Sequence, residues 1–265
     1  MKFGLSSISL FPFPLKTTLR KASMAGFDFV EVFLFGYWDE EVVDYFRMYA
    51  EGLKLQLHFH QVWTTNSSEK KEVWINHALT TLGQLPPEEY SRREWIPQNA
   101  RPFVAYAEEL ETSHLAGRDD VWFQAIASQC SLADRSPRLA YSAFLHGLRT
   151  RKLQTVFDTM HFIEYVRGDS GIEHSALATS EVLGLWERFW SEFHLQVREI
   201  HFNDFTTERN VWPGTGTAPL LEFADGVRRC GWDGAVVPEV RPRLPFPYGR
   251  KELLALRREM DGYFY

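Results

Sequence analysis

The sequence has few cysteines and no long apolar run. Only Cys130 and Cys230 occur in 265 residues, and neither belongs to a C-x-x-C pair, so a disulfide framework and a cysteine zinc site are both disfavoured. No apolar run approaches the roughly 18 residues that a membrane span needs. The first residues also lack a small-residue cleavage site, so no signal peptide is expected. A cytoplasmic protein is the default prediction.

An excess of positive charge is missing as well. The formal net charge is −6, which gives no overall attraction for a polyphosphate and disfavours nucleic acid as a partner. Hydrophobic residues make up 45% of the chain and aromatic residues 15%, which is ample for a packed core. The composition therefore predicts a globular protein.

Short β-rich runs alternate with longer segments of helical periodicity wherever the periodicity of the chain is clear. The runs predict strands at 2–10, 27–35, 53–63, 102–109, 121–127, 153–162, 197–205 and 234–240. The periodic segments predict helices at 15–26, 38–52, 68–85, 86–100, 136–151, 179–194, 217–231 and 249–264. Strands that alternate with single helices imply parallel strands joined by right-handed crossovers.

Eight such strands in 265 residues match the size of a (β/α)8 barrel, which needs about 33 residues per strand and helix. No linker or low-complexity tract divides the chain. We therefore predict an α/β fold, a single TIM barrel domain over residues 1–265, with an extended insert after the third strand at 64–101.

Polar residues close the apolar strands. In a (β/α)8 barrel the reactive residues stand at the carboxyl ends of the strands, where the βα loops form the open face. The residues that meet this condition are Glu31, His58, His60, Gln124, Asp158, His161, His201, Asn203 and Glu239.

Asp158, His201 and Glu239 end three successive strands and are expected to converge above the barrel mouth. Carboxylate oxygens and an imidazole nitrogen suit a divalent ion such as Mn²⁺, Zn²⁺, Co²⁺ or Mg²⁺. Asn203 shares a strand face with His201, because alternate residues of a strand point the same way. Asn203 and Asp204 are expected to fix the seventh loop, and Asn203 is also a candidate substrate contact.

Four segments, in this order and spacing, resemble the xylose-isomerase-like barrel family of sugar phosphate isomerases and epimerases. They are FDTMH at 157–161, EIHFND at 199–204, GTGTAPLLEFADGVRRCGWDG at 214–234 and VVPEV at 236–240. That family also contains hydroxypyruvate isomerases, inosose dehydratases, ketose 3-epimerases and apurinic endonucleases. The resemblance spans residues 150 to 240.

The resemblance implies a metal held by a Glu ending the fifth strand, the Asp of a D-x-x-H motif, a His ending the seventh strand and a Glu ending the eighth. Asp158, His201 and Glu239 occupy three of these places, whereas Gln124 stands in the place of the fifth-strand Glu. A glutamine offers a neutral amide oxygen but cannot act as a general base. The two-glutamate mechanism of ketose 3-epimerases is therefore disfavoured, and a one-base isomerisation, a dehydration or a loss of catalysis fits better.

The leading interpretation is a metal-dependent isomerase, epimerase or dehydratase that acts through an enediolate on a small sugar or polyol-derived carbonyl compound. Glu239 would be a ligand and a candidate base. His161, as the resemblance suggests, would hold a substrate oxygen or bind the metal. Further candidates for substrate contacts are Glu31, His58, His60, Asn203, Trp63 and Trp212, although both His58 and His60 fit the core equally well.

Two other functions compete with this interpretation. A degenerate barrel could bind a sugar or a protein partner without turnover, and Gln124 is its main support. A phosphodiester hydrolase of the apurinic-endonuclease type is disfavoured, because the further histidines of its metal cluster are missing and the chain is acidic. Barrels of this kind often form homodimers, although nothing in the sequence identifies an interface.

Overall fold

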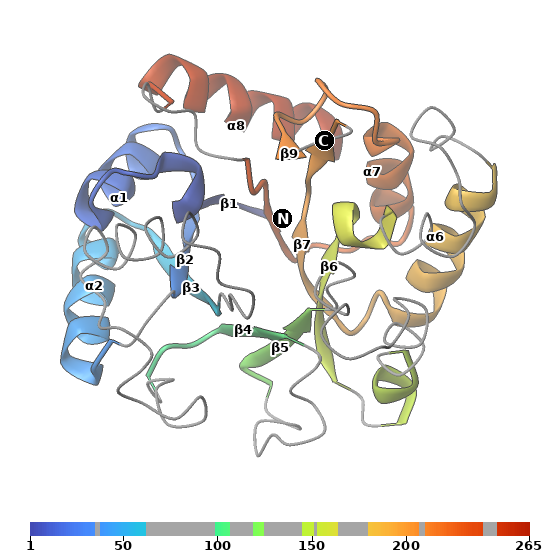
Figure 1. The fold of residues 1–265 in the computed structure, drawn as a ribbon, viewed down its shortest axis with the longest axis horizontal. Helices are drawn as coiled ribbons and strands as arrows, with labels where there is room; N and C mark the ends of the chain where they lie inside the picture. The colour runs from blue at the N-terminus through green and yellow to red at the C-terminus, as the bar shows by residue number, and fades with distance from the viewer. Residues whose placement is uncertain are drawn as a thin grey trace, which may run out of the picture.

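The computed structural model describes most of the barrel and its surrounding helices (Figure 1). The described residues are 1–34, 38–61, 99–106, 119–124, 145–150, 153–163, 180–206, 210–240 and 248–265. The predicted insert after the third strand lies almost wholly outside them, as do the helix predicted at 68–85 and most of the helices predicted at 86–100 and 136–151. Among the described helices, none has both the length and the apolar character needed to cross a membrane.

Eight parallel strands close into a barrel, which confirms the predicted fold class. Each strand pairs with its neighbours in chain order, and the last strand pairs back to the first. The barrel strands are β1 (Lys2–Ser6), β2 (Phe29–Leu34), β3 (Gln56–Gln61), β4 (Phe103–Tyr106), β5 (Val121–Gln124), β6 (Gln154–Asp158), β7 (Val197–His201) and β10 (Ala235–Val237). Two short strands, β8 (Asp204–Phe205) and β9 (Asn210–Val211), form a separate antiparallel pair after β7.

Helices lie outside the ring of strands, as Figure 1 shows. They are α1 (Leu15–Met24), α2 (Glu40–Gly52), α6 (Ser180–Phe193), α7 (Leu220–Arg229) and α8 (Arg250–Phe264), with a short 3-10 helix, η1 (Ser7–Leu10), after β1. The sequence explains their ends. Asp39 accepts a hydrogen bond from the backbone N–H of Val42, and two glutamates follow it in the first turn of α2, where negative charge is favourable.

Within the described residues, seven of the eight predicted strands are shorter in the structure, and this corrects the sequence-based bounds. The first strand ends at Ser6, where η1 begins, and the seventh ends at His201 before the separate strand β8. The sixth ends at Asp158, and residues 159–163 are helical. Oδ1 of Asp158 accepts hydrogen bonds from the backbone N–H groups of Met160 and His161, at 2.8 and 3.0 Å. Asp158 therefore caps a helical turn, a local preference that outweighs the β-like character of the TMHF segment.

Aromatic side chains fill the layer between the barrel and its helices on one side. Phe157 of β6 contacts Trp186 and Phe189 of α6, with ring centroids 4.5 and 4.9 Å apart. Trp186 also stacks on Phe223 of α7 at 4.4 Å. Because Phe157 precedes Asp158 and points to the opposite face of β6, this packing fixes the strand that directs Asp158 into the barrel.

The floor of the barrel is packed tightly around a glycine. Gly4 of β1 pairs with Phe29 of β2, and a Cβ atom added at Gly4 would lie 2.2 Å from the Phe29 ring. That ring is fully buried and stacks on His58, with centroids 4.0 Å apart. An added methyl group at Gly4 would therefore force this buried ring to shift against its neighbours.

Gly4→Ala is expected to lower the free energy of unfolding by about 1–3 kcal/mol, the range for overpacked cores. Denaturant unfolding monitored by circular dichroism measures the change. Gly52→Ala is the matched control, because no atom lies within 4 Å of the added Cβ at this last residue of α2. Equal unfolding midpoints for the two variants would contradict the tight floor.

Candidate metal centre

Three strand ends bring Asp158, His201 and Glu239 together. Asp158 and His201 are register partners on β6 and β7, and His201 also pairs with Val237, two residues before Glu239. Nδ1 of His201 lies 3.2 Å from Oε2 of Glu239 and 3.5 Å from Oδ2 of Asp158. One donor atom from each residue lies within 4.8 Å of the others, which is the spacing of a candidate metal site.

The two oxygens of Asp158 face different partners. Oδ1 caps the helical turn after β6, whereas Oδ2 faces Nδ1 of His201 at 3.5 Å. The backbone therefore fixes the rotation of the carboxylate, and one oxygen remains directed at the cluster. This arrangement explains the spacing of the D-x-x-H segment, because Asp158 caps the helical turn that carries His161 and the cap fixes the orientation of its carboxylate.

Gln124 stands at the end of β5, the fifth barrel strand, beside the same three residues. Its Nε2 lies 3.1 Å from both Oδ2 of Asp158 and Nδ1 of His201. Its Oε1 lies 2.7 Å from Nε2 of His60. The side chain is almost fully buried, at 1% exposure. A rotation of the amide by half a turn would direct its oxygen, in place of its nitrogen, at Asp158 and His201.

Asn203 ties the three loops of the cluster together. Its Nδ2 donates to Oδ2 of Asp158 at 3.2 Å and to Oε2 of Glu239 at 3.4 Å. Its Oδ1 accepts from the backbone N–H of Glu239, and its own backbone N–H donates to Thr159, both at 2.8 Å. Asp204 accepts hydrogen bonds from backbone N–H groups of the loop before α7. Asn203 and Asp204 thus hold the loops in place, as the sequence predicts.

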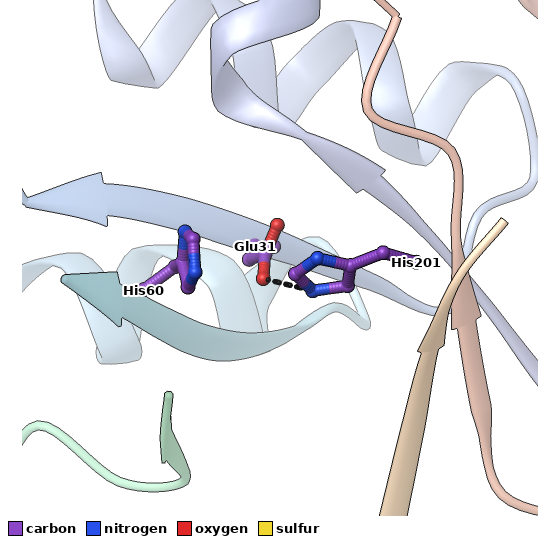
Figure 2. Close-up of side chains that lie close together, drawn as sticks. All are labelled: Glu31, His60 and His201. Atoms are coloured by element: carbon purple, nitrogen blue, oxygen red, sulfur yellow. Dashed lines mark ion pairs between the residues drawn. The ribbon is translucent and has the colours of Figure 1, made fainter. Parts of the chain in front are cut away.

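Beneath this group, Glu31 and His60 reach toward His201 from β2 and β3 (Figure 2). Oε1 of Glu31 lies 2.9 Å from Nε2 of His201, the interaction dashed in Figure 2. Donor atoms of Glu31, His60 and His201 also lie within 4.8 Å of one another. His201 therefore belongs to two groups of donors, and it faces Glu31 of the second group through Nε2.

Glu199 is a central residue that the sequence-based prediction missed. It is fully buried, its Oε1 lies 3.3 Å from Nε2 of His201, and its Oε2 lies 2.5 Å from Nδ1 of His58. Alternation along β7 contains the signal, because Glu199, His201 and Asn203 occupy every second position. His58, in turn, contacts Phe29 and Glu199, and these contacts place it in the floor of the barrel.

Opposing charges shift the pKa values of the residues nearest the mouth. Burial lowers the pKa of His201, but the carboxylates of Glu239 and Glu31 outweigh it and raise the pKa well above its usual value. Burial raises the pKa of Asp158, yet His161 and His201 bring it down to about 2. A proton on His201 thus neutralises part of the negative charge, and a divalent cation would replace that proton.

The pKa values of the deeper residues shift in different directions, depending on the groups that each residue contacts. Burial raises the pKa of Glu31 well above its usual value, because its single imidazole contact does not compensate for desolvation. Glu199 is equally buried, but His58 and His201 lower its pKa to about 2. Burial lowers the pKa of His60 to about 4, so this imidazole is neutral near pH 7.

Only the upper members of the cluster reach solvent. The side chains of His201 and Asp158 are 0% and 1% exposed, whereas those of Glu239 and His161 are 11% and 13% exposed. Nε2 of His161 lies 4.0 Å from Oδ2 of Asp158. A small molecule entering from the mouth would therefore meet Glu239 and His161 first.

The two predicted tryptophan contacts have different outcomes. Nε1 of Trp212 donates to Oε2 of Glu259 on α8 at 2.8 Å, and its ring lies 5.1 Å from that of Tyr248. Trp212 is thus anchored beside α8. Trp63 lies outside the described residues.

Solved structures share this architecture over the whole chain. The structure of L-ribulose 3-epimerase matches with a TM-score of 0.59 at 14% identity, covering 100% of this chain and 94% of the other. D-psicose 3-epimerase from Clostridium cellulolyticum H10, solved with D-tagatose, matches with a TM-score of 0.58 at 13% identity, covering 100% and 99%. A xylose isomerase domain protein from Alicyclobacillus acidocaldarius subsp. acidocaldarius gives 0.54 at 15% identity, covering 100% and 98%.

At this low identity the likeness shows the fold alone, and this barrel fold is the one that the resemblance to xylose-isomerase-like proteins implies. No family model matches the chain, and no curated protein matches its sequence. The activities of these solved proteins therefore bear on this chain only as support for a proposal.

Proposed function

We propose that this protein is a metal-dependent isomerase or dehydratase that acts on a small sugar or polyol-derived carbonyl compound. The observation that carries the proposal is the convergence of Asp158, His201 and Glu239 within 4.8 Å at the mouth of the barrel. The shared fold with sugar 3-epimerases supports the substrate class.

A divalent cation fits the donor set. Two carboxylates and one imidazole present Oδ2, Oε2 and Nδ1 to a common point, and Gln124 can add its amide oxygen. When bound, such an ion would polarise a substrate carbonyl and lower the energy of an enediolate. With Gln124 neutral, the two ligand carboxylates balance the charge of a divalent ion, and substrate oxygens could complete its coordination.

Glu239 is the residue best placed to move a proton. It combines a carboxylate, partial exposure at the mouth and a pKa that His201 lowers against the effect of burial, so it is ionised and able to accept a proton. His161, with similar exposure, would hold a substrate oxygen. Asn203 fixes Glu239 through both its backbone and its side chain, which keeps the base in one position.

Among the described residues at the mouth, Glu239 is the carboxylate placed to act as a base, and this restricts the reaction type. Inversion at one carbon needs a proton to be removed from one face and delivered to the other, which takes two groups. Gln124 cannot supply the second group. Transfer of a proton between adjacent carbons on one face, or loss of a neighbouring hydroxyl, needs only one. Isomerisation or dehydration is therefore favoured over 3-epimerisation.

Solvent exchange tests this proposal. In D₂O, the Mn²⁺-loaded protein is expected to introduce deuterium beside the carbonyl of a keto sugar or an inosose-like compound, as followed by NMR. Glu239→Gln should reduce the exchange by about 10²-fold or more, the contribution of a positioned general base. Removal of the metal with a chelator should stop it. If a panel of such compounds shows neither exchange nor turnover, the catalytic proposal fails.

Gln124 also supports a second candidate, a barrel that binds a sugar without turnover. A neutral amide in place of a carboxylate leaves the binding geometry intact while removing a catalytic group. Under this proposal, metal and sugar would both bind, as calorimetry can measure, but no deuterium would enter the sugar.

A further inference from the structure

His201 lies between two sets of donors that face its two ring nitrogens separately. Nδ1 faces Asp158 and Glu239, at 3.5 and 3.2 Å. Nε2 faces Glu31 and Glu199, at 2.9 and 3.3 Å. The ring is fully buried, so water does not compete for either side. An imidazole that binds a metal through one nitrogen must keep its proton on the other.

We propose that Glu31 and Glu199 are positioning residues that hold the proton on Nε2 of His201 and so leave the Nδ1 lone pair free for a metal. This inference rests on the metal centre of the proposed function and deepens it. Carboxylates that accept the second N–H of a metal-binding histidine fix its tautomer and its ring orientation, and they also increase its basicity.

The positions of Glu31 and Glu199 on their strands indicate that their contacts with His201 are specific. Glu199 lies two residues before His201 on β7, so alternation places both side chains on one face. Glu31 comes from β2, which is separated from β7 by β1 and β10 in the barrel order. Its carboxylate therefore crosses the barrel interior to reach Nε2, a contact that neighbouring strands alone would not produce.

Further contacts brace the pair. The second oxygen of Glu199 is held by Nδ1 of His58 at 2.5 Å, and His58 stacks on Phe29. Both carboxylates are fully buried. Two buried carboxylates at one nitrogen are costly unless that nitrogen carries a proton. Once a cation balances Asp158 and Glu239 at Nδ1, the proton that remains on the ring is therefore expected on Nε2, beside Glu31 and Glu199.

A second cation is the competing use of the same residues. Glu31, His60 and His201 each have a donor atom within 4.8 Å of the others. Among the described residues neither oxygen of Glu31 accepts a hydrogen bond, so Oε1 of Glu31 meets Nε2 of His201 as an ion pair at 2.9 Å, whereas Glu199 accepts a hydrogen bond from it. An ion there would have to displace the Nε2 proton while Nδ1 binds the first ion. Two ions per chain would therefore overturn the positioning role.

The test combines metal titration with NMR of the whole 265-residue chain. Calorimetry with Zn²⁺ is expected to show about one ion per chain, and Glu31→Gln and Glu199→Gln should each weaken binding about 10- to 100-fold. Glu259→Gln is the control, because Glu259 contacts Trp212 beside α8. It should leave the affinity unchanged, and circular dichroism should show that each variant is folded.

Imidazole ¹⁵N–¹H spectra of the Zn²⁺-loaded parent give a readout that a purely structural role would not move. We expect an Nε2–H signal for His201, assigned as the signal that His201→Gln removes. Ligation through Nε2, or unchanged affinity in both folded Glu→Gln variants, would overturn the positioning role alone. A parent that binds no metal would overturn the metal centre together with the inference that rests on it.

Discussion

Glu199→Ala is expected to lower the free energy of unfolding by about 3–5 kcal/mol, the usual result of removing one partner from a buried ion pair. Glu199 is fully buried and contacts two imidazoles, Nδ1 of His58 and Nε2 of His201. Its loss would leave both rings without this acceptor in a dry interior. Guanidinium unfolding with a chelator present measures the change without a contribution from bound metal.

An exposed ion pair provides the control for this stability measurement. Glu192 contacts Arg149 at 2.5 Å, but both side chains are largely exposed, at 43% and 51%. Glu192→Ala should therefore cost only about 0–1 kcal/mol, because water screens the pair. Similar losses for Glu199→Ala and Glu192→Ala would contradict the central place of Glu199 in the barrel.

Gln124→Glu is expected to raise the affinity for Mn²⁺ by about tenfold or more, because the number of charged ligands strongly affects cation affinity. The substituted carboxylate would lie beside Asp158 and His201, where the amide now lies 3.1 Å from both. Without metal, the added negative charge should destabilise the protein. The stabilisation by Mn²⁺, measured as the rise in Tm, should therefore be larger in the variant than in the parent.

The same variant tests the one-base argument. A carboxylate at position 124 would supply a second base across the cluster from Glu239, so that exchange at both faces of a substrate carbon becomes chemically feasible. Gln124→Ala is the matched control, and its affinity for Mn²⁺ should not exceed that of the parent. An unchanged Mn²⁺ affinity in Gln124→Glu would show that this side chain does not reach the metal.

Periodicity predicted most of the fold because the barrel repeats one simple unit. The alternation of strand and helix in the first 60 and last 110 residues matches the observed elements, with strands that end earlier than expected. The strands end where polar side chains form hydrogen bonds with backbone groups in place of the strand pairing. Asp158, for example, ends β6 by accepting two backbone hydrogen bonds, which a pattern of apolar residues does not reveal.

The candidate site was only partly accessible from sequence. The rule that reactive residues stand at strand ends selected Asp158, His201 and Glu239, because these positions share one face of the barrel. Glu199 lies two residues before His201 on β7, deeper in the barrel than the strand end, and the strand-end rule does not select it. Its partner Glu31 approaches from across the barrel, and contacts of this kind follow from closure, which local pattern cannot specify.

The metal content of the purified protein tests the central claim most directly. After loading with Mn²⁺, Co²⁺ or Zn²⁺ and removal of free ion, the parent is expected to retain about one ion per chain, held by the donor set described here. Asp158→Ala and His201→Ala should retain none while remaining folded by circular dichroism. A parent that retains no ion under any of these conditions, or variants that retain as much as the parent, would contradict a metal centre at the mouth of this barrel.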